Sequence, residues 1–193
     1  MNNRIFLYIF LCFGCVLSSC NNQSNTVAVH DFASVSVEYV QKVTELENKI
    51  DPTDIDSFLH INDSVSTCKQ KADSALNAVL ADVNDTLFIP FKQTKNTDKI
   101  SIQQVWVVDV DYDQLYIEAS VKALDNSAIH GPYTSLSAFD SEGKRIGVGG
   151  GIGGSSKTKL RAGEVYIFTG KIDNIHRLDD FAYLQFDENI KKW

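Results

Sequence analysis

The chain has 193 residues, of which 18 are Lys or Arg and 25 are Asp or Glu, so its formal net charge is −7. An acidic chain lacks the basic surface that nucleic-acid phosphates require, which excludes nucleic acid as an expected partner. The length is enough for one or two small domains with a hydrophobic core.

The first twenty residues are typical of an export signal. Residues 1–4 carry one positive charge, at Arg4, and residues 5–17 form an apolar run without any charge. This run is too short to span a bilayer, which takes about 20 residues, but it has the length of a signal-peptide core. The run ends in Leu17-Ser18-Ser19-Cys20, which resembles the lipobox of bacterial lipoproteins.

This resemblance implies that residues 1–19 are a signal peptide, cleaved between Ser19 and Cys20. In this family the cysteine receives a diacylglycerol through its sulfur, and its new amino group can be acylated as well. Two or three acyl chains hold a protein essentially permanently, because each buried CH₂ contributes about 0.8 kcal/mol. The expected location is the cell envelope, on the outer membrane facing the periplasm, with surface exposure as an alternative. An ordinary secreted protein is the other interpretation.

Cleavage would leave 174 residues with 17 basic and 25 acidic side chains, a net charge of −8. A chain of this charge does not bind anionic lipid through its own side chains, so the lipid on Cys20 would be its only contact with the membrane. Cleavage would also remove Cys12 and Cys15, and because the lipid would occupy the sulfur of Cys20, Cys68 would have no cysteine to pair with in the chain. We expect Cys68 to be a small buried residue, with pairing between chains as the alternative.

Residues 20–30 are polar and predict a flexible, lipidated tether, and residues 31–84 predict a helical hairpin. Apolar residues recur three and four positions apart from Phe32 to Ile50 and again from Ile55 to Val83. Asp51-Pro52 separates the two stripes, and Asp51 can cap the second helix. We expect each stripe to be buried against the other. A groove that binds a partner is the alternative.

From residue 85 the pattern changes to short runs of alternating apolar residues separated by turns. Residues 100–124 predict a long hairpin with one apolar face, and Pro90 marks the preceding run as an edge or end strand. Short strands at this interval predict an antiparallel β-sandwich over residues 85–193. The predicted fold class is therefore α+β, a helical hairpin followed by an immunoglobulin-like sandwich.

Three stretches carry a resemblance to small immunoglobulin-like domains of bacterial lipoproteins, of the FxLYD and DUF4352 kinds. They are residues 117–127, 138–143 and 160–164, and the resemblance covers roughly residues 100–187. Such domains are mostly of unknown function, so the resemblance implies a fold rather than an activity. The helical segment lies outside it.

A glycine-rich segment, residues 149–154, matches G-x-G-x-x-G, and residues 151–158 come one residue short of a P-loop. Both motifs require a helix after the glycines to hold a phosphate, whereas residues 160–172 predict a strand. We therefore expect no nucleotide and no other cofactor, and interpret the segment as a flexible or bulged loop. The surrounding loops are candidates for contact with an anion, a small ligand or a partner through His130, Tyr133, Lys157, Lys159 and Arg161.

Residues 109–113 alternate acids as a calcium loop does, but they lack the glycine and the distant glutamate of an EF-hand. We interpret them as a hairpin tip with solvated carboxylates. The four histidines show no ligand spacing, so no metal is expected. No serine, histidine and acid lie in a nucleophile-elbow context, so no enzyme is predicted. An enzyme would require His130 or His176 to converge with an acid in a cleft.

These observations predict a non-enzymatic interaction or scaffolding module, anchored in the cell envelope through Cys20, with an envelope protein as its partner. The alternative is a periplasmic or surface protein that binds a small ligand or a glycan through the loops of the sandwich.

Overall fold

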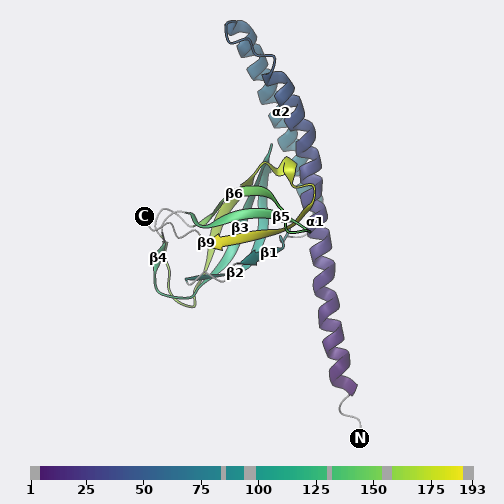
Figure 1. Ribbon diagram of the computed structural model, residues 1–193, viewed down its shortest axis with the longest axis vertical. Coiled ribbons are helices and arrows are strands. Elements are labelled where there is room, and N and C mark those ends of the chain that lie inside the picture. Colours follow the sequence, from purple (N-terminus) through teal and green to yellow (C-terminus); the bar gives the residue numbers. More distant parts are fainter. Residues whose placement is uncertain (1–4, 84–85, 94–98, 130–131, 154–157, 189–193) are drawn as a thin grey trace.

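A computed structural model describes residues 5–83, 86–93, 99–129, 132–153 and 158–188 (Figure 1). Side chains are described from residue 26 onward, except at 128, 129, 132, 133, 148, 158 and 188. Two helices precede a set of strands, which confirms the α+β class. The elements are α1 Ile5–Glu47, α2 Ile55–Asp82, β1 Phe91–Gln93, β2 Ile100–Asp111, β3 Gln114–Ala123, β4 Ala128–Ile129, β5 Pro132–Asp140, β6 Arg145–Gly153, β7 Thr158–Lys159, β8 Val165–Asp173, the 3-10 turn η1 Ile175–Arg177 and β9 Phe181–Glu188.

The second half of α1 and the whole of α2 form a helical hairpin (Figure 1). Val43, Val65 and Cys68 are buried between the two helices, so the predicted burial of Cys68 is confirmed. The cap of α2 is Asp54, whose side chain accepts hydrogen bonds from the backbone N–H groups of residues 56 and 57. The prediction of Asp51 as the cap was wrong, because its carboxylate instead accepts from the backbone and the hydroxyl of Thr53.

The folded body begins before residue 31, where the sequence predicted the end of a tether. Helix α1 runs through residues 20–30, and Ala28 and Val29 are buried. Val29, Phe32 and Ala33 occupy one helical face, which shows that the apolar stripe starts one turn earlier than predicted. The polar residues 21–25 concealed this start in the sequence.

The strands form one curled sheet of seven strands in the order β1-β9-β5-β6-β8-β3-β2, and β4 pairs separately with β7 (Figure 1). Neighbours in the large sheet are antiparallel, except for the parallel pair β1–β9. The predicted sandwich of two facing antiparallel sheets is therefore not confirmed. A single sheet that curls can enclose a core on its concave face, as two facing sheets do in a sandwich.

The segment from Leu87 to Gln93, which includes β1, bonds to β2 at one side of this sheet and to β9 at the other. On one side Ile89 donates to Val105 O of β2 at 2.8 Å, and Val107 donates back to Leu87 O at 3.0 Å. On the other side β1 pairs with β9, and Leu184 donates to Pro90 O at 2.9 Å. The segment around Pro90 therefore covers the outer sides of β2 and β9, which protects these strands from pairing with another chain.

The core lies between the concave face of the sheet and the helices. Alternate residues of β3, from Leu115 to Ala123, are buried as the sequence predicts. Phe168, Leu136 and Phe186 from other strands pack into the same cluster, and so do Phe32 of α1 and Leu76 of α2. The helical hairpin and the sheet thus share one hydrophobic core.

Candidate binding pocket at the junction of helices and sheet

The residues predicted for lipidation and for the ligand loop lie mostly where side chains are not described. Ser19 and Cys20 fall within α1, but their side chains lie outside the described part, as does that of Tyr133 in β5. His130 and Lys157 lie outside the described residues altogether. The structure therefore leaves these predictions untested.

Two residues of the predicted loop are described, and both are exposed. Lys159 ends the short strand β7. The Nη1 atom of Arg161 lies 3.6 Å from Oε1 of Glu164, and its backbone N–H donates to the hydroxyl of Tyr166. Arg161 thus has a local acidic partner, and an exposed pair of this kind stabilises the fold very little.

The prediction of a flexible or bulged loop was wrong for residues 149–153, which form the end of a strand, and residue 154 lies outside the described residues. Residues 149–153 belong to β6, and its pairing with β8 shifts register between Gly149 and Ile152. Gly151 has a φ of 88°, a conformation that glycine adopts without strain. Tyr116, Thr169 and Lys171 line a shallow cavity of about 360 Å³ over these glycines, together with Gly150, Gly151 and Gly170.

A second cavity, of about 420 Å³, lies where α2 meets the β2–β3 turn and the end of β8. Its lining is almost entirely polar or charged, with one aromatic ring. The residues are Lys69, Asp111, Tyr112, Asp113, Gln114, Asp173 and Asn174. We call this cavity the junction pocket, and it is the candidate site.

Tyr112 forms the wall of the junction pocket in a strained backbone conformation. Its φ is 35°, which residues other than glycine seldom adopt. Its N–H donates to Oδ1 of Asp73 at 2.6 Å, and the ammonium of Lys69 lies 5.0 Å from its ring centroid. Burial raises the pKa of the Tyr112 hydroxyl to about 12, and the charge of Asp113 adds to the effect. Helix α2 therefore fixes the position of this ring.

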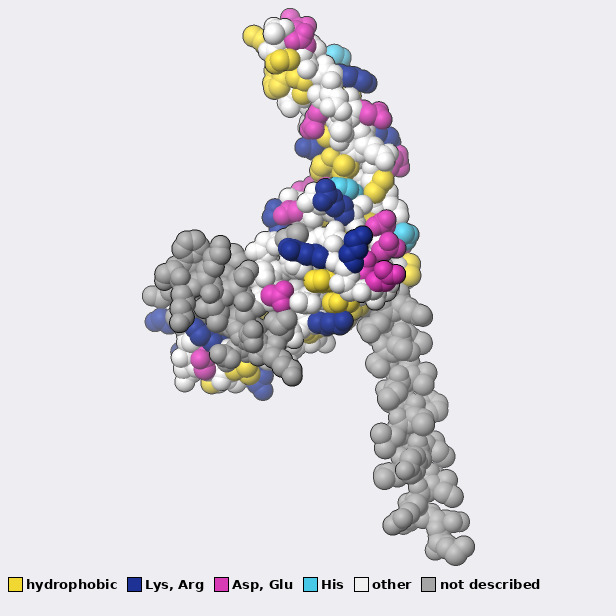
Figure 2. Space-filling model, in the orientation of Figure 1, with side chains coloured by type: hydrophobic (Ala, Val, Ile, Leu, Met, Phe, Trp, Pro, Cys, Tyr) yellow, Lys and Arg dark blue, Asp and Glu magenta, His cyan; other side chains and the backbone are white. Residues whose placement is uncertain are grey.

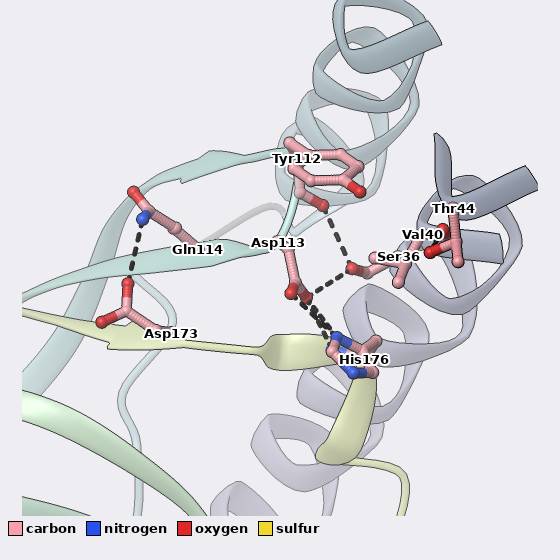
Figure 3. A network of polar contacts seen from close by, with 8 residues as sticks. All are labelled: Ser36, Val40, Thr44, Tyr112, Asp113, Gln114, Asp173 and His176. Atoms are coloured by element: carbon pink, nitrogen blue, oxygen red, sulfur yellow. Dashed lines mark hydrogen bonds and ion pairs between the residues drawn. The ribbon is translucent and has the colours of Figure 1, made fainter. Parts of the chain in front are cut away.

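Asp113 connects three elements beside the pocket (Figure 3). The hydroxyl of Ser36, on α1, donates to Asp113 Oδ1 at 2.8 Å and to Tyr112 O at 3.1 Å. His176, on η1, donates its backbone N–H to Asp113 Oδ1 at 3.0 Å, and its Nδ1 lies 2.8 Å from both carboxylate oxygens. The carboxylate thus ties the β2–β3 turn to a helix and to η1. The prediction of solvated carboxylates at this tip was wrong for Asp113.

This network contains a serine, a histidine and an acid, but not in the order that nucleophilic catalysis requires. His176 does converge with an acid beside a cavity, which was the condition set for an enzyme. Ser36, however, is fully buried and donates to Asp113 instead of His176. A nucleophilic hydroxyl must contact the base that takes its proton. The geometry therefore suits positioning of the pocket wall.

Asp73 and Asp111 form a pair of neighbouring carboxyl groups at the rim of the pocket. A hydrogen bond with Asp73 raises the pKa of Asp111, and partial burial and the charge of Asp73 raise it further, against a smaller lowering by Lys69. Over the part of the chain that the structure describes, no group of three or more His, Cys, Asp or Glu side chains could hold a metal ion.

The raised pKa of Asp111 makes a prediction about pH. The folded protein holds this proton more tightly than the unfolded chain, so the stabilisation is full below pH 3.8, the unperturbed value, and is lost as pH rises through the higher folded pKa. Asp111→Asn should therefore unfold at a higher urea concentration than wild type at pH 7, with a smaller difference at pH 4. Asp109→Asn removes the same charge from the same strand and serves as the control. A less stable Asp111→Asn at pH 7 would contradict the pairing.

Sequence reasoning missed the junction pocket because its residues come from distant parts of the chain. The bond from Tyr112 to Asp73 spans 39 positions, and the bond from His176 to Asp113 spans 63. The acidic run at 109–113 was the only signal in the sequence, and alone it resembled a solvated turn.

The chain matches no protein-family model, no curated protein and no solved structure. Among the residues that the structure describes, no helix combines the length and the apolar character needed to cross a membrane. The fold and the pocket define the protein as an α+β protein in which a helical hairpin docks on a curled sheet.

Proposed function

We propose that this protein is a bacterial lipoprotein, anchored through Cys20, that acts as a non-enzymatic interaction module in the cell envelope. The proposed location is the outer membrane, facing the periplasm, and the proposed partner is another envelope protein. The observation that carries the proposal is the Leu17-Ser18-Ser19-Cys20 sequence within α1, a short way before the part of that helix that enters the core.

The spacing between the anchor and the core supports this role. The first buried side chain described is Ala28, eight positions after Cys20. A helix of eight residues rises about 12 Å, so a lipid on Cys20 would hold the sheet close to the bilayer. The turn between α1 and α2 lies at the opposite end of the molecule from the start of α1 (Figure 1). The hairpin would then extend away from the membrane, where a partner can reach it.

Replacement of Cys20 tests the anchor. Cys20→Ala should move the protein from the membrane fraction to the soluble fraction, or leave an uncleaved precursor, because no sulfur remains to accept the diacylglycerol. Cys15→Ala removes a thiol from the segment that is cut away and should change neither. Fractionation and intact mass measure both outcomes. An unchanged distribution and mass in Cys20→Ala would sink the proposal.

A second candidate function is binding of a small polar ligand, and the strained Tyr112 in the wall of the junction pocket favours it. Strained residues of this kind concentrate at functional sites. The carboxylate and amide oxygens of Asp173, Gln114 and Asn174 can accept hydrogen bonds from sugar hydroxyls. A panel of mono- and disaccharides should then include one that raises the melting temperature of wild type but not of Tyr112→Ala. A flat response over the whole panel at millimolar concentration counts against this function.

A further inference from the structure

The apolar stripe of α2 continues beyond the part that α1 covers. Ile55, Phe58 and Leu59 are 74%, 45% and 55% exposed, although their spacing places them on one side of the helix. Figure 2 shows apolar side chains gathered at the end of the hairpin, beside acidic ones. We call Ile55, Phe58 and Leu59 the hairpin-tip patch.

Phe58 follows the buried face of α2 and is uncovered because α1 ends early, whereas Leu59, nine positions before Cys68, lies on the side of α2 opposite that face. Helix α1 stops at Glu47, whereas α2 begins at Ile55, so the first turns of α2 extend alongside the connecting turn and not alongside a helix. The buried contacts between the helices start further from the tip, at Val43 and Val65. A neighbouring cluster of exposed apolar side chains, unlike a single one, marks an interaction surface.

Acidic side chains surround this patch. Residues 47–59, from the end of α1 to the first turns of α2, carry four acids against one base, Lys49. The acids are exposed, and they are Glu47, Asp51, Asp54 and Asp56. A second copy of the tip would bring like charges together, and the carboxylates would be repelled by an anionic bilayer. A partner surface that is apolar at its centre and basic at its rim would complement both the apolar patch and the carboxylates around it.

We propose that the hairpin-tip patch docks into an apolar pocket, rimmed by Lys or Arg side chains, on another protein of the envelope. The inference rests on the proposed function, which places the partner in the envelope, and the hairpin turn lies at the opposite end of the molecule from the start of α1 (Figure 1). Phe58 and Leu59 supply the apolar anchors, and the carboxylates of Asp51 and Asp56 pair with the basic rim. Binding should therefore weaken both when the apolar side chains are removed and when salt screens the rim.

Photocrosslinking in the producing cells tests this surface with the full chain. A benzoylphenylalanine at position 58 should form a crosslink to a different protein, which mass spectrometry identifies. The same probe at position 167 is the control, because Ile167 is also apolar and 52% exposed but lies on β8. A crosslink to a second copy, a crosslink to lipid, or no product above that of position 167 would each overturn the proposal.

The identified protein is then purified and its affinity measured. Phe58→Ser with Leu59→Ser should weaken binding at least about tenfold, as loss of central anchors does, while Val165→Ser with Ile167→Ser leaves it unchanged. Asp56→Asn and rising salt should each weaken it by a smaller factor. All four substituted apolar side chains are exposed, so the variants keep the fold, which their melting temperatures check. Equal binding by both double variants, or no effect of salt, overturns the assignment.

These outcomes are separate from those for the anchor. Purified proteins bind through the tip whether or not Cys20 carries a lipid. Cys20→Ala can therefore refute the anchor while the affinity at the tip stays intact, and the tip variants can fail while the protein remains on the membrane.

Discussion

Phe32→Ala should destabilise the protein by about 3–5 kcal/mol, the usual loss when a buried phenylalanine is truncated. Phe32 is fully buried, and it brings α1 into the same cluster as Leu136 and Phe168 of the sheet. Its removal leaves a cavity where the helix meets the sheet. Because a domain of this size is stable by only about 5–15 kcal/mol, the loss is a large share of the total. Urea unfolding of the purified protein measures it.

Val27→Ala is the matched control for this change. Val27 lies on the same helix, five residues earlier, but is 57% exposed. Its truncation should change the free energy of unfolding by no more than about 0.5 kcal/mol. If Phe32→Ala cost as little as Val27→Ala, the helix would not close the core of the sheet, and the close anchor argued above would lose its basis.

Gly151→Ala should destabilise the protein by about 2–5 kcal/mol, for two reasons that add. The φ of 88° is unfavourable for a residue with a Cβ by about 1–2 kcal/mol. A Cβ at this position would also lie 1.9 Å from the carbonyl oxygen of Thr134, so β5 and β6 would have to separate. Forcing extra atoms into a packed site costs a further 1–3 kcal/mol or so.

Substitutions at two other glycines separate the cost of backbone strain from the cost of the close contact. Gly163 has a φ of 86° with no atom within 4 Å of its would-be Cβ, so Gly163→Ala reports the backbone strain alone. Gly150 has neither a positive φ nor a neighbour within 4 Å, so Gly150→Ala should be close to neutral. Chemical denaturation of the three variants should rank the losses as 151, then 163, then 150. Equal losses at 151 and 163 would show that the tight strand contact is absent.

The local elements of the fold could be predicted from the sequence. The hairpin follows from apolar residues at helical spacing, and the inward face of β3 follows from strict alternation between Leu115 and Ala123. Both patterns depend only on neighbours in the sequence, which is why they were readable. The start of α1 was placed too late because the polar residues before Val27 outweighed the apolar pair Ala28 and Val29.

The arrangement of the sheet could not be predicted in the same way. Alternation of apolar and polar residues identifies a strand but does not show which strand lies next to it. The frequent turns between short strands led to the prediction of two facing sheets. The decisive contacts are distant ones: β1 pairs in parallel with β9, and Ile89 bonds to Val105. Pro90 was correctly recognised as unable to donate within a ladder, yet its segment bonds to β2 on one side and to β9 on the other, where a single edge was predicted.

The site shows the same limit. Asp113 was recognised as part of an acidic turn, but its carboxylate bonds to Ser36 and His176, which come from distant parts of the chain. The exposure of the hairpin-tip patch could not be predicted from the sequence either. The sequence shows that Phe58 continues a helical stripe, but only the structure shows that α1 ends at Glu47 and leaves this side chain exposed.

The central claim is that the mature protein begins at a lipidated cysteine. Intact-mass and N-terminal peptide analysis of the protein, extracted in detergent from membranes of the producing cells, tests it most directly. We predict a first residue at position 20 that carries a diacylglycerol on its sulfur. A mature chain that starts at any other residue, or a position 20 without fatty acid, would contradict the account.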